Sequence, residues 1–200
     1  MKKINVVAFL AKSGTGKSTI IEKMSEQHPV ILTSVKSYST REPRDEFDKL
    51  THVFVEPEFY IKNQSKALLT YYNPEQNYFN WVDESSFDED KINLYAIDVN
   101  AYNKLASLEN FNVLGIYLDI DEKEREKRIT NRGGEYTQED WLDKSLIDPK
   151  HIENNKCIIL DCSGTVERNV ALVEKAINPM VMSYLFDRYS EMFGGIVDGE

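Results

Sequence analysis

The chain of 200 residues, 41% of them hydrophobic, is long enough to build the core of one ordinary domain. With 29% charged residues and only 9 Gly and 6 Pro, it is neither collagen-like nor wholly disordered. Its formal net charge is −10, from 24 Lys and Arg against 34 Asp and Glu. Because binding to nucleic-acid phosphates requires surplus cation, we expect no nucleic-acid partner, and any phosphate site must be a local basic pocket.

Continuous apolar runs predict five buried strands: Ile4–Leu10, Val30–Val35, Ile92–Ile97, Val113–Leu118 and Cys157–Leu160. Helical patterns lie between most of these runs: Lys17–Gln27, Ala101–Leu108, Glu122–Asn131 and Val166–Ile177. This alternation predicts a three-layer α/β fold with a parallel sheet covered on both faces. The first apolar run is too short for a signal peptide or a membrane span, so we expect a cytoplasmic protein without a membrane partner.

Two stretches interrupt the alternation. Residues 37–90 are rich in aromatic and turn residues and predict a small inserted lobe, and residues 132–140 predict a short mobile lid. We expect one domain over residues 1–178, followed by a helical extension over 179–200. The two cysteines, Cys157 and Cys162, are too few for a disulfide scaffold, and we interpret them as buried thiols.

The segment after the first strand carries the strongest motif, Ala11-Lys12-Ser13-Gly14-Thr15-Gly16-Lys17-Ser18-Thr19. A strand, a Gly-rich turn and a helix that opens at Lys-Ser are the context of a phosphate-binding loop. Gly14 and Gly16 allow successive N–H groups to point at phosphate oxygens, and the helix dipole adds to the attraction. We expect residues 13–19 to bind ATP, with Lys17 reaching the β- and γ-phosphates and Ser18 holding Mg2+. Ala11 replaces the usual first Gly, which we expect to tighten the loop without abolishing function.

A second motif, Ser37-Tyr38-Ser39-Thr40-Arg41-Glu42-Pro43-Arg44, places two arginines around a stiffening proline and after several hydroxyl groups. A guanidinium group grips phosphate oxygens through two parallel N–H bonds. The motif therefore suits a phosphate monoester, although such an octapeptide on its own is more often a solvated charged turn.

Taken together, the phosphate-binding loop, the S-x-S-T-R-x-P-R motif and the strand at Phe54-Val55 resemble guanylate kinase and its relatives. The strand near Tyr78, the Ile97-Asp98 pair and the R-x-x-x-R-G stretch at Arg128–Gly133 follow in family order. The resemblance covers residues 4–177. It implies a P-loop NTPase fold and transfer of the γ-phosphoryl group of ATP to a nucleoside monophosphate.

The resemblance also implies roles for individual side chains. The acceptor phosphate would be bound by a group on the lobe: Ser37, Arg41, Arg44, Glu46 and Tyr78. Arg128 and Arg132 would clamp the transferring phosphoryl group together with Lys17. Arg125 stands where relatives often carry an apolar residue, and it belongs either to the same cationic face or to a solvated, salt-bridged one.

Further positions depart from the family pattern. His52 replaces a usual tyrosine, either as a donor to phosphate or as a structural ring. Lys144 is the candidate to replace a missing lid arginine. The carboxylates that read guanine in relatives are absent: the Leu68–Thr70 stretch has no acid, and the second position is Asn100. Loss of buried acceptors matched to a base weakens discrimination strongly, so the acceptor could be GMP, dGMP or another monophosphate.

Asn80, Asp98 and Asn100 are predicted to complete the acceptor site. An Asn amide both donates and accepts, so it can face several bases. Asp98 ends a strand at the carboxyl edge of the sheet, where open α/β sheets bind ligands, and it can also cap the following helix.

The sequence thus predicts an ATP- and Mg2+-dependent nucleoside monophosphate kinase with small-molecule nucleotides as partners. Two alternatives stay open: a P-loop kinase for another small metabolite, and a guanylate kinase-like protein-binding module without catalysis. An unphosphorylated alcohol has no phosphate for the Ser37–Arg44 motif to bind. A protein-binding module would not need a complete phosphate-binding loop.

Overall fold

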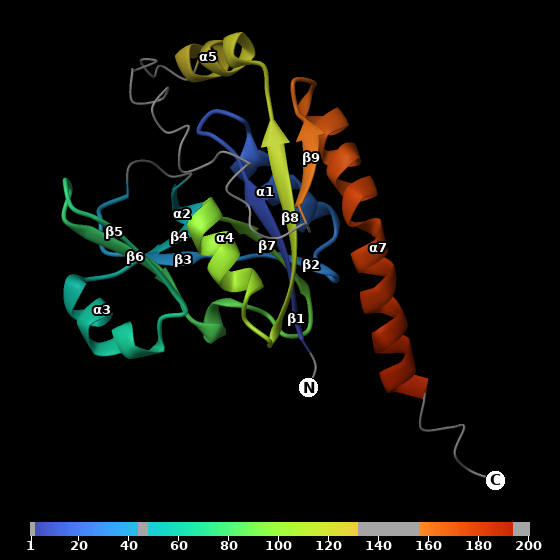
Figure 1. Cartoon of the computed structure of the whole chain (residues 1–200), viewed down its shortest axis with the longest axis horizontal. Helices are drawn as coiled ribbons and strands as arrows, with labels where there is room; N and C mark the ends of the chain where they lie inside the picture. The colour runs from blue at the N-terminus through green and yellow to red at the C-terminus, as the bar shows by residue number, and fades with distance from the viewer. Residues whose placement is uncertain (1–2, 44–47, 132–156, 194–200) are drawn as a thin grey trace.

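A computed structural model of the chain describes residues 3–43, 48–131 and 157–193 (Figure 1). Its main sheet has five parallel strands in the order β2 Leu32–Ser34, β7 Ile92–Ala96, β1 Ile4–Leu10, β8 Phe111–Asp119 and β9 Cys157–Asp161. The central strand β1 pairs with β7 on one side and β8 on the other. The parallel sheet predicted from continuous apolar runs is confirmed.

Helices cover both faces of this sheet. They are α1 Lys17–Gln27, α4 Val99–Ala106 and α7 Val166–Phe193. Because side chains alternate along a strand, β1 contributes to two separate cores. Val7 and Phe9 pack in the cluster that includes α1 and α7, whereas Val6 and Ala8 pack in the cluster that includes Tyr102 of α4. The predicted three-layer arrangement is confirmed.

The helix α7 runs without a break through Pro179. The sequence predicts separate helical segments on either side of residue 178, because a proline inside a helix removes a hydrogen bond and clashes with the preceding turn. Buried side chains before and after the proline, Ile177 and Tyr184, belong to the same apolar cluster. Arg188 Nη1 also donates to Asp90 Oδ1 at 2.7 Å. These contacts hold both halves of α7 against the domain and outweigh the local effect of the proline.

A second sheet fills most of the predicted lobe. Its strands lie in the order β4 His52–Phe54, β3 Ser37–Ser39, β6 Tyr78–Val82 and β5 Leu69–Asn73. Short helices flank it: α2 Asp48–Thr51, α3 Pro57–Asn63, η1 Gln64–Lys66 and η2 Glu84–Ser86. The indole ring of Trp81 lies 5.1 Å from the ring of Tyr38 and 4.9 Å from that of Tyr60, between ring centroids. Aromatic packing therefore forms the core of the lobe.

The helix α5 Glu122–Asn131 follows β8 and lies beyond the carboxyl end of the main sheet (Figure 1). Its bounds are those that the sequence predicts. Among the residues that the structure describes, no helix is both long and apolar enough to span a membrane.

Buried phenol and thiol groups predict that the fold loses stability at alkaline pH. Burial raises the pKa of the Cys162 thiol from 9.0 to about 11, and burial raises that of the Tyr102 phenol from 10.0 to about 12. The buried protonated thiol makes its full contribution to the free energy of unfolding below the pKa that it has in the unfolded chain. This contribution is lost as the pH rises through the pKa of the thiol in the folded protein. We expect urea midpoints to fall across this window, and less steeply for Cys162→Ala. If the urea midpoints of the parent protein and Cys162→Ala fall equally with pH, the Cys162 thiol is not a cause of the loss.

Candidate functional site

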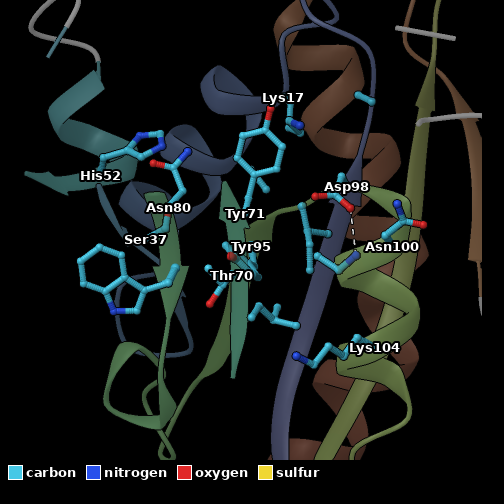
Figure 2. A pocket seen from close by; sticks show the side chains of 16 residues that line it. Lys17, Ser37, His52, Thr70, Tyr71, Asn80, Tyr95, Asp98, Asn100 and Lys104 are labelled. Carbon is cyan, nitrogen blue, oxygen red and sulfur yellow. Dashed lines mark hydrogen bonds between the residues drawn. The ribbon is translucent and has the colours of Figure 1, made fainter. Parts of the chain in front are cut away.

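A cleft of about 710 Å³ lies between the main sheet and the lobe. Figure 2 labels ten of its lining residues: Lys17, Ser37, His52, Thr70, Tyr71, Asn80, Tyr95, Asp98, Asn100 and Lys104. They come from the phosphate-binding loop and α1, from the lobe strands, and from β7 and α4. The cleft thus brings residues predicted for the donor and for the acceptor into one site. Lys17 and Asp98 lie toward one end and Lys104 toward the other (Figure 2).

The phosphate-binding loop has the shape that its glycines permit. Gly14 and Gly16 have φ angles of 81° and 97°, in the left-handed region that favours glycine. The buried Thr15 hydroxyl donates to the Lys12 carbonyl at 2.7 Å and closes the turn. Gly16 is the N-cap of α1 and supplies no side-chain acceptor, so the first-turn N–H groups of α1 face the loop. Such N–H groups form an anion-binding site.

Gly14 also lies in close contact with α5. A Cβ atom at this position would stand 2.7 Å from Ile129 Cγ1, whereas one at Gly16 would meet only an Arg128 nitrogen at 3.9 Å. We expect Gly14→Ala to lower the melting temperature more than Gly16→Ala and to weaken Mg-ATP binding at least about tenfold, because the loop must shift. Thermal unfolding and calorimetric titration of both variants test this. If the two variants lose melting temperature and affinity equally, the cause is the backbone strain that both positions share, and the contact with Ile129 has no part in it.

Arg125 and Arg128 of α5, which the sequence singles out, both donate hydrogen bonds to backbone carbonyls of the loop. Arg128 Nη1 donates to the Thr15 carbonyl at 3.1 Å, and Nη2 donates to the Gly164 carbonyl at 3.1 Å. Its predicted role as a clamp on the phosphoryl group stays a prediction. Arg125 is fully buried, and its Nη1 donates to the Ser13 carbonyl at 3.0 Å. The interpretation of Arg125 as a solvated residue is wrong, because α5 packs directly on the loop.

Arg41 is engaged by other side chains of the lobe. Its two terminal nitrogens donate to both carboxylate oxygens of Asp48, at 2.6 and 2.9 Å. The guanidinium carbon lies 5.2 Å from the ring centroid of Phe54 and 5.9 Å from that of the buried Tyr78. Among the described residues, neither Arg41 nor Tyr78 belongs to the cleft lining. Their contact with an acceptor phosphate stays a prediction, whereas Ser37 lines the cleft directly.

The amide of Asn80 is incompletely satisfied. Its Oδ1 atom is buried and accepts no hydrogen bond from the described residues. Tyr71 stands directly opposite Asn80 in the β5–β6 pairing and also lines the cleft. Although Tyr71 belongs to the aromatic-rich stretch of the lobe, 45% of its surface is exposed. The cross-strand pairing that places Tyr71 in the cleft follows from the strand register, which its local sequence does not reveal.

Asp98 caps α4 as expected and lies on the cleft wall, while its predicted contact with an acceptor stays a prediction. Its Oδ1 accepts the Ala101 N–H at 2.8 Å and caps α4, and the residue also lines the cleft. Burial, with the nearby Asp98 charge, raises the pKa of Tyr95, so this cleft residue remains a neutral phenol. His52 lines the cleft too, and its Nδ1 lies 2.8 Å from the Thr51 hydroxyl. Asn100 lines the same wall at the start of α4.

Some predicted site residues lie outside the described ones. They are Arg44, Glu46, Arg132, the lid at 132–140 and Lys144.

Comparisons with known proteins agree on the architecture. No protein-family model matches the sequence, and no curated protein matches it significantly. A guanylate kinase from Anaplasma phagocytophilum superposes with a TM-score of 0.60 at 16% identity, over 90% of this chain and 88% of that one. A gluconokinase from Sinorhizobium meliloti 1021 superposes with a TM-score of 0.51 at 11% identity, over 94% of this chain and 99% of that one. At such identities the likeness concerns the fold alone, and this chain has the fold of P-loop kinases.

Proposed function

We propose that the protein is a nucleoside or deoxynucleoside monophosphate kinase that uses Mg-ATP as the phosphoryl donor. The observation that carries the proposal is the single cleft in which Lys17 of the phosphate-binding loop faces Ser37, Asn80 and Tyr71 of the lobe. A donor triphosphate on the loop and an acceptor against the lobe would meet within it. A guanylate kinase among the structural neighbours is consistent with this arrangement.

The transfer would depend on positioning and charge. An acceptor phosphate is already anionic, so it needs no strong base, and catalysis consists of alignment and charge neutralisation. Lys17 would neutralise the transferring group while the loop amides bind the neighbouring phosphates. Ser18 and Asp98 supply hydroxyl and carboxylate oxygens, which Mg2+ prefers, and the Asp98 helix cap uses only one carboxylate oxygen. The ion would neutralise charge on the phosphate oxygens.

Amide side chains are the candidates for recognition of the base. Asn80 of the lobe and Asn100 of α4 both line the cleft, and the described carboxylate among its lining residues, Asp98, is the one proposed above for Mg2+. An amide pairs with a ring that offers an N–H beside a carbonyl oxygen, or with one that offers an amino group beside a ring nitrogen. We therefore place GMP and dGMP among several possible acceptors, rather than first.

A panel assay tests the proposed function. ATP consumption is coupled to a dye reaction and measured with each ribose and deoxyribose monophosphate, with Lys17→Ala as the matched inactive control. Turnover of at least one monophosphate supports the proposal. Calorimetric binding of Mg-ATP without turnover of any monophosphate rejects it, and absence of Mg-ATP binding favours a protein-binding module.

The gluconokinase neighbour supports a second candidate, a kinase for another small metabolite. The same assay with sugar acids and polyols distinguishes the two. An unphosphorylated alcohol would need a general base, so such turnover should depend on a titratable cleft residue such as Asp98.

A further inference from the structure

Two arginines of α5 donate hydrogen bonds to backbone carbonyls of the phosphate-binding loop. Arg125 Nη1 donates to the carbonyl of Ser13 at 3.0 Å, and Arg128 Nη1 donates to that of Thr15 at 3.1 Å. The two accepting carbonyls belong to Ser13 and Thr15, which are separated by Gly14. Both arginines therefore contact the backbone of the loop from the α5 side.

Arg125 is unusual because its charge is completely enclosed. The residue is fully buried, and its Nε donates to Glu122 Oε1 at 3.1 Å. The other oxygen of Glu122 accepts from Lys12 Nζ at 3.2 Å, so the Lys12–Glu122–Arg125 chain carries one net positive charge. Burying an ion is strongly unfavourable unless it is paired and hydrogen-bonded, and here Glu122 and the Ser13 carbonyl satisfy it.

The geometry of the peptide bond links these contacts to phosphate binding. In a trans peptide the C=O and the following N–H point in opposite directions. A Ser13 carbonyl directed at Arg125 therefore directs the Gly14 N–H away from α5, and the Thr15 carbonyl on Arg128 does the same for the Gly16 N–H. The positive φ angles of Gly14 and Gly16 complete a concave row of donors.

We propose that Arg125 is a positioning residue for the donor site: it holds the Ser13–Gly14 peptide in the orientation that offers its N–H to a bound phosphate. This inference rests on the donor half of the proposed function, and it concerns triphosphate binding rather than the acceptor. An apolar side chain at 125 would leave the Ser13 carbonyl without this donor, and the peptide could rotate. Lysine would keep the charge but lose the fork that spans Ser13 and Glu122.

The experiment uses the full chain and a double variant, Arg125→Met with Glu122→Gln, so that the half-buried Glu122 carboxylate does not lose the charge of Arg125. Glu122→Gln alone is measured beside it, because this change also alters the contact with Lys12. The probes are Mg-ATP and inorganic tripolyphosphate, measured by calorimetry. We expect both affinities to fall about tenfold, because a positioned donor is lost, while the melting temperature stays close to that of the parent protein. We expect both affinities of Arg125→Lys to lie between those of the parent protein and those of the double variant. Arg188→Met removes an exposed ion pair to Asp90, far from the loop in sequence, and is the matched control.

A second measurement separates positioning from general stability. We expect the Gly14 amide resonance to shift and its hydrogen exchange to accelerate in the double variant, while the amide of Gly115 in the central sheet stays unchanged. Unaltered tripolyphosphate affinity overturns the proposal, and so does a loss of affinity that tracks a general fall in melting temperature. The proposed function fails separately, if the parent protein binds Mg-ATP yet phosphorylates no monophosphate.

Discussion

Replacement of Lys17 by alanine should lower kcat/KM for phosphoryl transfer by about a thousandfold, while the protein stays folded. Lys17 opens α1 beside Gly16 and lines the cleft, where its charge would face the group being transferred. Removal of one preorganised donor from a developing charge typically reduces the rate by about 10²–10³, and loss of a full positive charge reduces it further. Initial rates with saturating ATP and acceptor measure the effect.

The control for this variant is Lys23→Ala on the same helix. Lys23 Nζ lies 3.0 Å from Glu167 Oε1 of α7, and its side chain is 40% exposed. An exposed ion pair contributes little to stability, so we expect nearly unchanged turnover. A Lys17 variant that keeps more than about a tenth of the activity would be incompatible with charge stabilisation by this lysine.

Asn80→Leu should raise the stability of the fold and weaken acceptor binding at the same time. The buried Oδ1 of Asn80 has no hydrogen-bond partner among the described residues, and an unsatisfied buried acceptor destabilises a fold by about 1–3 kcal/mol. Leucine removes this atom and suits a strand better than asparagine does. Loss of the same atom should raise the acceptor KM by about ten- to a hundredfold, with the KM for ATP unchanged.

Asn93→Leu provides the contrast. Asn93 is also a buried strand asparagine, but its Nδ2 donates to three backbone carbonyls and its Oδ1 accepts the Asp88 N–H at 2.8 Å. Its replacement leaves buried groups unpaired, so we expect a loss of about 2–4 kcal/mol in unfolding free energy. If Asn80→Leu destabilises as much as Asn93→Leu, Oδ1 of Asn80 has a structural partner and is not a ligand-binding atom.

The sheet and most helices were predictable because their signals are local. Apolar runs such as Ile4–Leu10 and the helix pattern at Glu122–Asn131 keep their predicted bounds. A run that is apolar at every position can be buried only between two layers, which fixes the architecture. The course of α7 through Pro179 was not predictable, because it depends on contacts between Tyr184 and a distant apolar cluster.

The phosphate-binding loop was easier to predict from the sequence than the residues that surround it. Residues 13–19 carry their signal in spacing alone, and Gly14 and Gly16 adopt the positive φ angles that favour glycine. Arg125 has the same spacing signal as an exposed helix residue, yet it contacts Ser13, which is 112 positions away in the sequence. Tyr71 enters the cleft through its pairing with Asn80, whereas Tyr78 lies beneath Arg41. Such placements depend on how distant elements pack, and a single sequence does not encode them locally.

The central position of β1 determines the order in which this chain can fold during synthesis. β1 is made before both of its neighbours: β7 and β8 follow roughly 90 and 110 residues later, which takes on the order of ten seconds at ordinary translation rates. Until then Val7 and Phe9 lack the strands beside them, and both backbone edges of β1 stay open. A nascent chain that stops before Phe111 therefore leaves one edge of β1 unpaired, and the domain forms late, through contacts of large sequence separation.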